Sequence, residues 1–170
     1  MPRLASALLL SLAALPAAWG HANLPTGFLG VALGAPLARQ HAVARACESL
    51  APERRRCVLS DTVTVVLVRD SVTLVSFAPA PLRPQVTAEA AWQRWRAWVE
   101  RQFGPPDSVV TRRHQTGRAL IAYWRSRTRP GLQATFVASE ITSLAGPRAQ
   151  AFTQVTVGLV CDPPSAGQGP

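Results

Sequence analysis

The sequence predicts an α+β fold: an antiparallel sheet of about six strands with two helices packed on one face, in the order α-β-β-α-β-β-β-β. Three observations lead to this prediction. The segment 86–107 has the apolar periodicity of a long amphipathic helix, and a weaker pattern at 37–50 predicts another helix. Runs of β-branched residues separated by turn sequences fill the rest. A sheet with helices on one face would bury both kinds of element.

The segment 86–107 predicts the clearest helix and carries three of the five tryptophans. At 100° per residue its apolar side chains fall within an arc of roughly 140°. They are Ala88, Ala91, Trp92, Trp95, Trp98, Val99 and Phe103. Thr87 is a suitable N-cap, Glu89 suits the first turn, and Gly104 with two following prolines ends the helix. We expect this stripe to pack on a sheet; the alternative is an exposed platform for stacking a ligand.

The remaining elements are predicted from shorter patterns. The helix at 37–50 is expected to end at Pro52, and a polar loop with the arginine run 54–56 follows it. Asp70 and Ser71 provide a turn between the first two strands, and a proline-rich link leads to the tryptophan helix. The predicted strands are 57–69, 72–78, 108–116, 118–127, 132–141 and 151–161.

The N-terminus predicts a secretory signal peptide. A basic start precedes an apolar run, and Ala18 and Gly20 place small residues at the −3 and −1 positions. Cleavage is expected before His21, with cleavage after Ala22 as the second choice. The run is too short to span a bilayer, and no cysteine follows the cleavage region, so we expect neither a membrane span nor a lipid anchor.

The predicted location is therefore periplasmic or secreted. The predicted organisation is a signal peptide at 1–20, a single α+β domain at 21–162 and a disordered tail at 163–170.

The charge balance indicates what such a protein would meet. The formal net charge is +9 at pH 7, and all eighteen basic residues are arginine. A basic exported protein attracts anions, so the candidate partners are an envelope protein, an anionic polymer or a lipid head group; nucleic acid is not favoured. The alternative is a soluble protein whose arginines are only solvated.

The three cysteines are Cys47, Cys57 and Cys161. Export permits disulfides. We favour a bridge between Cys47 and Cys57, which enclose a short polar loop; Cys57 with Cys161 is the alternative, since both flank strand-like runs. The sequence has no CxxC motif of the thioredoxin type, and the cysteine spacing fits no zinc site. We therefore predict neither a metal nor another cofactor.

No catalytic motif is present. The sequence lacks GxSxG, HExxH, Walker and GxGxxG patterns, and its acidic residues are scattered without a paired spacing. The favoured function is a non-catalytic binding module. The alternative is a periplasmic enzyme, such as a cell-wall hydrolase, whose site is assembled from distant residues.

The candidate binding surface consists of Arg112, Tyr123, Arg125 and Arg127. Alternate residues of a strand share a face, so Arg125 and Arg127 are expected beside Tyr123, with Arg112 on the neighbouring strand. If the helix covers the face that contains Trp124, these arginines line the open face. Guanidinium groups bind carboxylates and phosphates in a forked geometry. A solvated outer face is the alternative.

Two phrases of the sequence support a family resemblance. Gly30-Val-Ala-Leu-Gly-Ala-Pro-Leu37 precedes one predicted helix, and Phe103-Gly-Pro-Pro-Asp107 follows the other. They resemble small bacterial envelope domains of the BamE lipoprotein type and the similar β-lactamase inhibitor protein. The resemblance covers the element order of most of the predicted mature chain, and it implies helices on an antiparallel sheet and a role in binding proteins. The lipid-bearing cysteine of the lipoprotein type is absent.

The predicted signal peptide can be tested directly. Mass spectrometry of the protein purified from the cell envelope should find the N-terminus at His21 or close to it, because the apolar run and the small residues before it specify cleavage. Recovery of the chain with Met1 intact from the cytoplasm would contradict the prediction.

Overall fold

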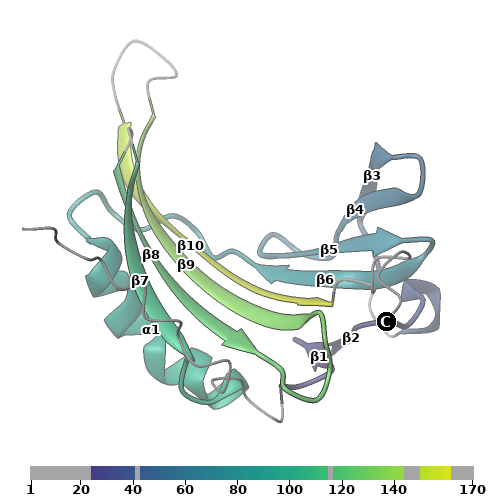
Figure 1. Cartoon of the computed structure of the whole chain (residues 1–170). Helices are drawn as coiled ribbons and strands as arrows, with labels where there is room; N and C mark the ends of the chain where they lie inside the picture. The colour runs from purple at the N-terminus through teal and green to yellow at the C-terminus, as the bar shows by residue number, and fades with distance from the viewer. Residues whose placement is uncertain (1–23, 41–42, 115–116, 144–149, 162–170) are drawn as a thin grey trace, which may run out of the picture.

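The computed structural model describes residues 24–40, 43–114, 117–143 and 150–161. The predicted signal peptide and tail lie outside these residues. The described chain forms an eight-stranded antiparallel sheet, a two-stranded β1–β2 hairpin and one α-helix (Figure 1). No helix in this part of the chain is long and apolar enough to cross a membrane.

The strands are β1 (Gly27–Phe28), β2 (Val31–Ala32), β3 (Ala46–Ala51), β4 (Arg54–Val58), β5 (Val63–Val68), β6 (Ser71–Phe77), β7 (Ser108–His114), β8 (Gly117–Arg125), β9 (Leu132–Ser143) and β10 (Gln150–Cys161). A 3₁₀ turn, η1, spans Leu37–Arg39, and helix α1 spans Ala88–Phe103. The order in the large sheet is β3-β4-β5-β6-β10-β9-β8-β7, so β10 joins two halves by pairing with β6 on one side and β9 on the other.

Helix α1 has the capping groups that the sequence predicts. The side-chain oxygen of Thr87 accepts a hydrogen bond of 3.1 Å from the backbone N–H of Ala90. Gly104 ends the helix with a positive φ of 78°, which glycine adopts without steric cost. The sheet adds a further cap, since Glu140 Oε1 accepts from the backbone N–H of Ala88 at 2.8 Å. The N-terminus of the helix is thereby attached to β9.

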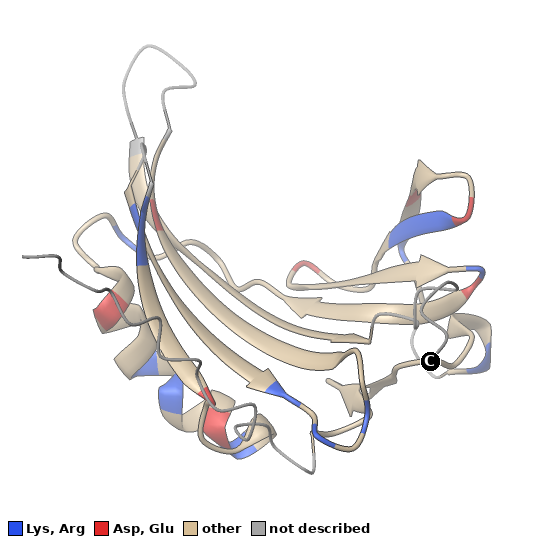
Figure 2. Cartoon of the chain, in the orientation of Figure 1, with Lys and Arg blue, Asp and Glu red and all other residues tan. Residues whose placement is uncertain are grey.

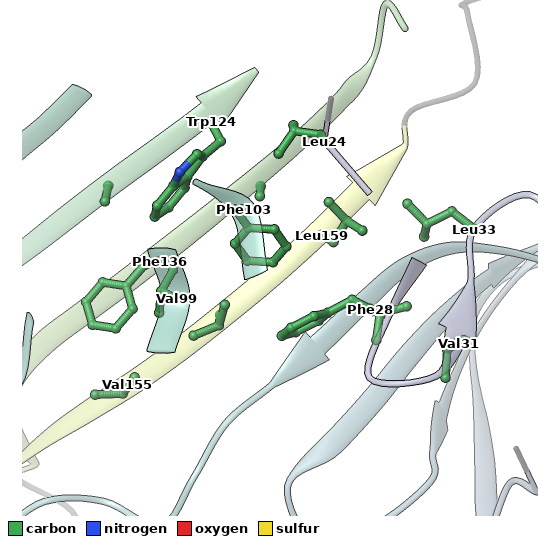
Figure 3. Close-up of a cluster of buried hydrophobic side chains, with 14 of the residues drawn as sticks. Leu24, Phe28, Val31, Leu33, Val99, Phe103, Trp124, Phe136, Val155 and Leu159 are labelled. Atoms are coloured by element: carbon green, nitrogen blue, oxygen red, sulfur yellow. The ribbon is translucent and has the colours of Figure 1, made fainter. Parts of the chain in front are cut away.

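The indole stripe of α1 packs on one face of β8, β9 and β10. The Trp92 ring centroid lies 6.4 Å from that of Trp124 and 5.0 Å from that of Phe136. Trp124 is fully buried, and its Nε1 donates a hydrogen bond of 2.9 Å to the carbonyl oxygen of Gly104. Figure 3 shows Trp124 and Phe136 within the same cluster as Phe103. The helix is therefore a core element, as its periodicity predicts.

The N-terminal segment covers the core beside the helix. Phe28 of β1 is buried, and its ring contacts the rings of Trp98 and Phe103. Figure 3 shows Phe28 and Phe103 in the same cluster. Hydrogen bonds fix this segment against β6, including one of 2.8 Å from the Gly34 N–H to the Val72 carbonyl oxygen. The buried side chains that the segment supplies are Leu24, Phe28, Val31, Leu33 and Leu37. A short hairpin and a turn thus occupy the place expected for a second helix.

The predicted fold class of two helices on a six-stranded sheet is wrong. The segment 37–50 is not a helix: its described residues, 37–40 and 43–50, contain only the η1 turn before strand β3. Its supposed apolar face is not buried as a unit, because Val43 is 81% exposed and Leu50 is 49% exposed although Leu37 is buried. Strand β3 turns at Pro52 and Glu53 into β4, so the polar loop expected before the first strand is a β-hairpin. This hairpin supplies the two additional strands.

The predicted strand 57–69 is also divided. Strand β4 ends at Val58 and β5 begins at Val63, and Ser60 lies in the turn between them. The Ser60 hydroxyl oxygen accepts from the N–H groups of Thr62 and Val63 at 3.3 and 3.1 Å. A serine that bonds the backbone of the next residues favours a turn over a continuous strand. The predicted strands after this point coincide with β6 to β10 apart from small differences at their ends.

A disulfide bond joins Cys47 and Cys57, as favoured from the sequence. The two residues lie directly opposite each other on β3 and β4, with their Cα atoms 4.1 Å apart. Cys161, at the end of β10, is a free cysteine, so the alternative pairing of Cys57 with Cys161 is wrong. The bond fixes the β3–β4 hairpin at one edge of the sheet.

Replacing Trp92 with alanine should lower the free energy of unfolding by about 3–5 kcal/mol, because a buried indole would be replaced by a cavity. Trp92 is only 5% exposed and lies between α1 and the sheet. Urea unfolding followed by circular dichroism measures the change, and Gln93→Ala on the exposed side of α1 is the control. Equal stability of the two variants would contradict this description of the core.

Candidate functional site

The register of the sheet assigns each residue of β8 to one of two faces. Ala122 and Trp124 are fully buried beneath α1. Tyr123 lies between these two residues and Arg125 follows Trp124, so both belong to the opposite face. Tyr123 is partly exposed there and Arg125 is exposed. In Figure 1, α1 lies along the convex side of β7–β10, and no helix of the described chain lies on the concave side. We refer to this second face, which contains Tyr123 and Arg125, as the open face.

The middle of the open face is uncharged. Pairing across the sheet places Thr135, Gly158 and Ser76 in one row beside Tyr123. The row beside Arg125 begins with four uncharged residues: Gln133, Val160, Leu74 and Val66. It ends on the β3–β4 hairpin with Arg56 and Glu48, which form an ion pair. Hydroxyl and aliphatic side chains therefore cover the centre of this face, and the charges lie near its edges (Figure 2).

Three arginines occupy alternate positions at and just beyond the end of β8. We refer to residues 125–131 as the arginine turn. Arg125, Arg127 and Arg129 are all exposed. Two hydrogen bonds shape the turn: the Ser126 hydroxyl oxygen accepts from the Arg129 N–H at 3.0 Å, and the Asp107 carboxylate accepts from the Arg125 N–H at 2.7 Å. None of the ion pairs in the described part of the chain involves these three arginines.

The structure brings together only some of the predicted site residues. Tyr123 and Arg125 lie two residues apart on the open face of β8, as expected. Arg127 lies beyond the end of β8 and belongs to the turn rather than to the strand face. Arg112 is opposite Ala119, so it shares the open face but lies about 20 Å from Arg125 along the strand, at about 3.3 Å per residue. The four residues therefore do not form one continuous patch.

The most conspicuous arginine run in the sequence is largely neutralised. Arg55 pairs with Asp70, and Arg56 Nη2 lies 2.6 Å from Glu48 Oε1 across the β3–β4 hairpin. Close by, Arg69 Nε donates to Glu53 Oε2 at 2.7 Å, and this hydrogen bond raises the pKa of Arg69 above its ordinary value. The hairpin thus contains basic side chains whose charge is offset by carboxylates (Figure 2).

The candidate site predicted from the sequence omits two features of the arginine turn. Arg129 alternates with Arg125 and Arg127 but is outside the predicted site, and in the structure its backbone N–H donates to the Ser126 hydroxyl of the same turn. Asp107 was identified only as part of a phrase that follows the helix, yet it fixes the backbone of Arg125. These two residues are eighteen positions apart in the sequence and are brought together by the β7–β8 pairing. No local pattern in the sequence reveals this contact.

The described side chains suit the binding of anions. Guanidinium groups present planar forks of donors to carboxylates and phosphates. Within the described residues, no group of three or more histidine, cysteine, aspartate or glutamate side chains could hold a metal ion. The uncharged face beside the arginines offers aliphatic and hydroxyl contacts. The arrangement can therefore hold an anionic group beside aliphatic and hydroxyl side chains.

Comparison of the chain with protein families, curated proteins and solved structures finds no match to any of them. The candidate site is therefore inferred from its geometry alone.

The role of Asp107 in the arginine turn can be measured. Asp107→Ala should increase the amide hydrogen exchange rate of Arg125 by roughly tenfold or more, since a hydrogen bond to a charged acceptor typically contributes about 1.5–3 kcal/mol. Asp107→Asn keeps an acceptor and should restore much of the protection. Unchanged exchange in both variants would show that the carboxylate does not hold the turn.

Proposed function

We propose that the protein is a non-catalytic binding module of the bacterial cell envelope, which acts in the periplasm or after secretion and binds an anionic group of its partner at the arginine turn. The observation that carries the proposal is the arrangement of Arg125, Arg127 and Arg129. Their three side chains project from a hydrogen-bonded turn next to an uncharged sheet face, and none takes part in the ion pairs of the described chain.

Two further features support this proposal. The disulfide between Cys47 and Cys57 is typical of proteins that fold in an oxidising compartment, which agrees with the predicted signal peptide. The formal net charge of +9, carried by arginine alone, favours an anionic partner. The partner is expected to be an acidic protein, an anionic polymer or an anionic head group, since each presents the carboxylates or phosphates that guanidinium groups bind.

The packing explains why this surface is available. Helix α1 and the N-terminal segment cover one face of the sheet, so they leave Tyr123 and Arg125 on the other face. A charge at the rim of an interface mainly accelerates encounter and sets specificity, and salt screens its effect. Binding through the arginine turn should therefore weaken as salt concentration rises.

The test is a charge reversal at the turn. Arg125→Glu with Arg127→Glu should leave the unfolding temperature almost unchanged, because both side chains are exposed. Binding to immobilised poly-glutamate and to phosphatidylglycerol vesicles should fall by at least about fivefold at low salt, since two attractions become repulsions. The two probes separate a carboxylate-bearing partner from a phosphate head group.

Arg94→Glu with Arg101→Glu is the matched control. Both residues are exposed on α1, and the change in net charge is the same. If the two double variants lose binding equally, the effect reflects net charge alone and the proposed site is wrong. Equal binding by the wild type and both variants would contradict the proposed function as a whole.

A further inference from the structure

Strand β7 forms one edge of the large sheet and has a long unpaired side. It pairs with β8 over its whole length, from Ser108 opposite Tyr123 to His114 opposite Gly117, without any register shift. No other strand of the described chain pairs with it. Alternate N–H and C=O groups of an edge strand point away from its neighbour, so this side of β7 presents a regular row of hydrogen-bonding groups.

The edge lacks most of the features that usually prevent strand addition. Native edge strands are commonly interrupted by proline or a bulge, are very short, or carry charged side chains, and only the last of these holds for β7, through Arg112 and Arg113. Strand β7 contains seven residues with no proline and no irregularity, and Val109 and Val110 are 44% and 37% exposed. The opposite edge, β3, has a register shift between Ser49 and Ala51. Of the two edges, β7 is the one suited to receive another strand.

The charges of β7 show what kind of strand would fit. Arg113 lies directly opposite Arg118 on the helix side of the sheet, and like charges in this position destabilise a sheet. Glu89 pairs with Arg118, and none of the ion pairs in the described chain includes Arg112 or Arg113. The row across the sheet from Arg112 contains only uncharged side chains: Ala119, Ser139 and Gln154. The carboxylates at this corner are already engaged, since Glu89 pairs with Arg118 and Glu140 caps the helix N-terminus. Arg112 and Arg113 thus have no ion-pair partner among the described ion pairs and favour a carboxylate on an incoming strand.

We propose that β7 binds an extended acidic segment of a partner protein, which adds to the sheet as a further strand. This inference rests on the proposed function, because it specifies the anionic partner as an acidic polypeptide and gives it a second point of attachment. Successive side chains of a strand point to opposite faces. The partner strand should therefore carry two consecutive acidic residues beside Arg112 and Arg113, and aliphatic residues beside Val109 and Val110.

Charge argues against a second copy of the chain as the occupant. Antiparallel pairing of two β7 strands about Thr111 would set each Arg112 beside Val110 of the other copy. The two Arg112 side chains would then be diagonal neighbours on one face, with no carboxylate between them. The chain also carries a large positive charge, formally +9 over its whole length, which opposes association of two copies. An acidic segment of another protein removes both difficulties.

The probe is a labelled peptide of sequence Thr-Glu-Glu-Thr-Val-Val-Thr, whose antiparallel alignment places its glutamates beside Arg112 and Arg113. Binding is followed by fluorescence anisotropy with the full protein at low salt. Two N-methylated forms of the peptide test for strand addition, since each blocks the N–H groups on one side of the strand only. One form should bind at least about tenfold more weakly and the other about as well as the parent peptide.

The protein variants test the charge pattern. Arg112→Glu with Arg113→Glu should weaken binding of the acidic peptide by about tenfold and improve binding of a Lys-Lys version, because the sign of the attraction reverses. Arg94→Glu with Arg101→Glu is again the control for net charge. Both pairs are exposed, so folding should not change, and thermal unfolding checks this.

Three results would overturn the inference. Equal binding of both N-methylated peptides would show that no strand is added. Equal weakening by the β7 variant and the control would show a non-specific charge effect. A dimer in light scattering that the acidic peptide dissociates would mean that a second copy occupies β7. If strand addition is disproved in one of these ways but charge reversal at Arg125 and Arg127 still abolishes polyanion binding, the proposed function stands without strand addition. If neither the Arg125/Arg127 variant nor the Arg112/Arg113 variant affects binding of any probe, both the proposed function and the strand addition are wrong.

Discussion

The packing of the α1 indoles on β8, β9 and β10 determines which surfaces the rest of the molecule can offer. Trp92 lies against both Trp124 and Phe136, so helix and sheet share one aromatic core. Burial of these aromatic side chains stabilises the fold, because large apolar surfaces leave water. Because alternate residues of a strand point to opposite faces, fixing Trp124 inward also fixes Tyr123 outward. One contact thus decides the orientation of every residue on β8.

A sheet that packs on one side only has its remaining face and its edges available for recognition. The arginines are not spread evenly over these surfaces. On the β3–β4 hairpin they are balanced by carboxylates, for example Arg56 with Glu48 at 2.6 Å. At the arginine turn and on β7 no such balance exists among the described ion pairs. Uncompensated charge is therefore a better guide to the binding surface than the density of arginine in the sequence.

The sequence predicts the elements whose patterns are strong and fails where the local pattern is ambiguous. The helix and β6 to β10 have clear caps, alternation or turn residues, and Thr87 and Gly104 act as expected. The segment 37–50 has only a weak apolar stripe, and β3 is exposed along its whole length. Its strand conformation depends on pairing with β4 and on the disulfide, which are contacts that a helical periodicity cannot reveal.

Prediction of the candidate site from the sequence also fails where contacts between distant segments decide the structure. Alternation places Tyr123 and Arg125 on one face, which the structure reproduces, but it extends the strand too far toward Arg127. The position of Arg112 depends on the register between β7 and β8, and sequence alone does not provide it. Asp107 contributes through a contact across this same pairing.

The central position of β10 has a consequence for the order in which the protein can fold. It is the last of the described strands along the chain, yet it joins β6 to β9. A chain emerging from a ribosome or a membrane channel can form local hairpins early, but the two halves of the sheet meet only after residues 150–161 are released. Contacts between segments so distant in sequence form slowly. The polypeptide would thus stay loosely structured until its last strand arrives, a state compatible with passage through a narrow channel.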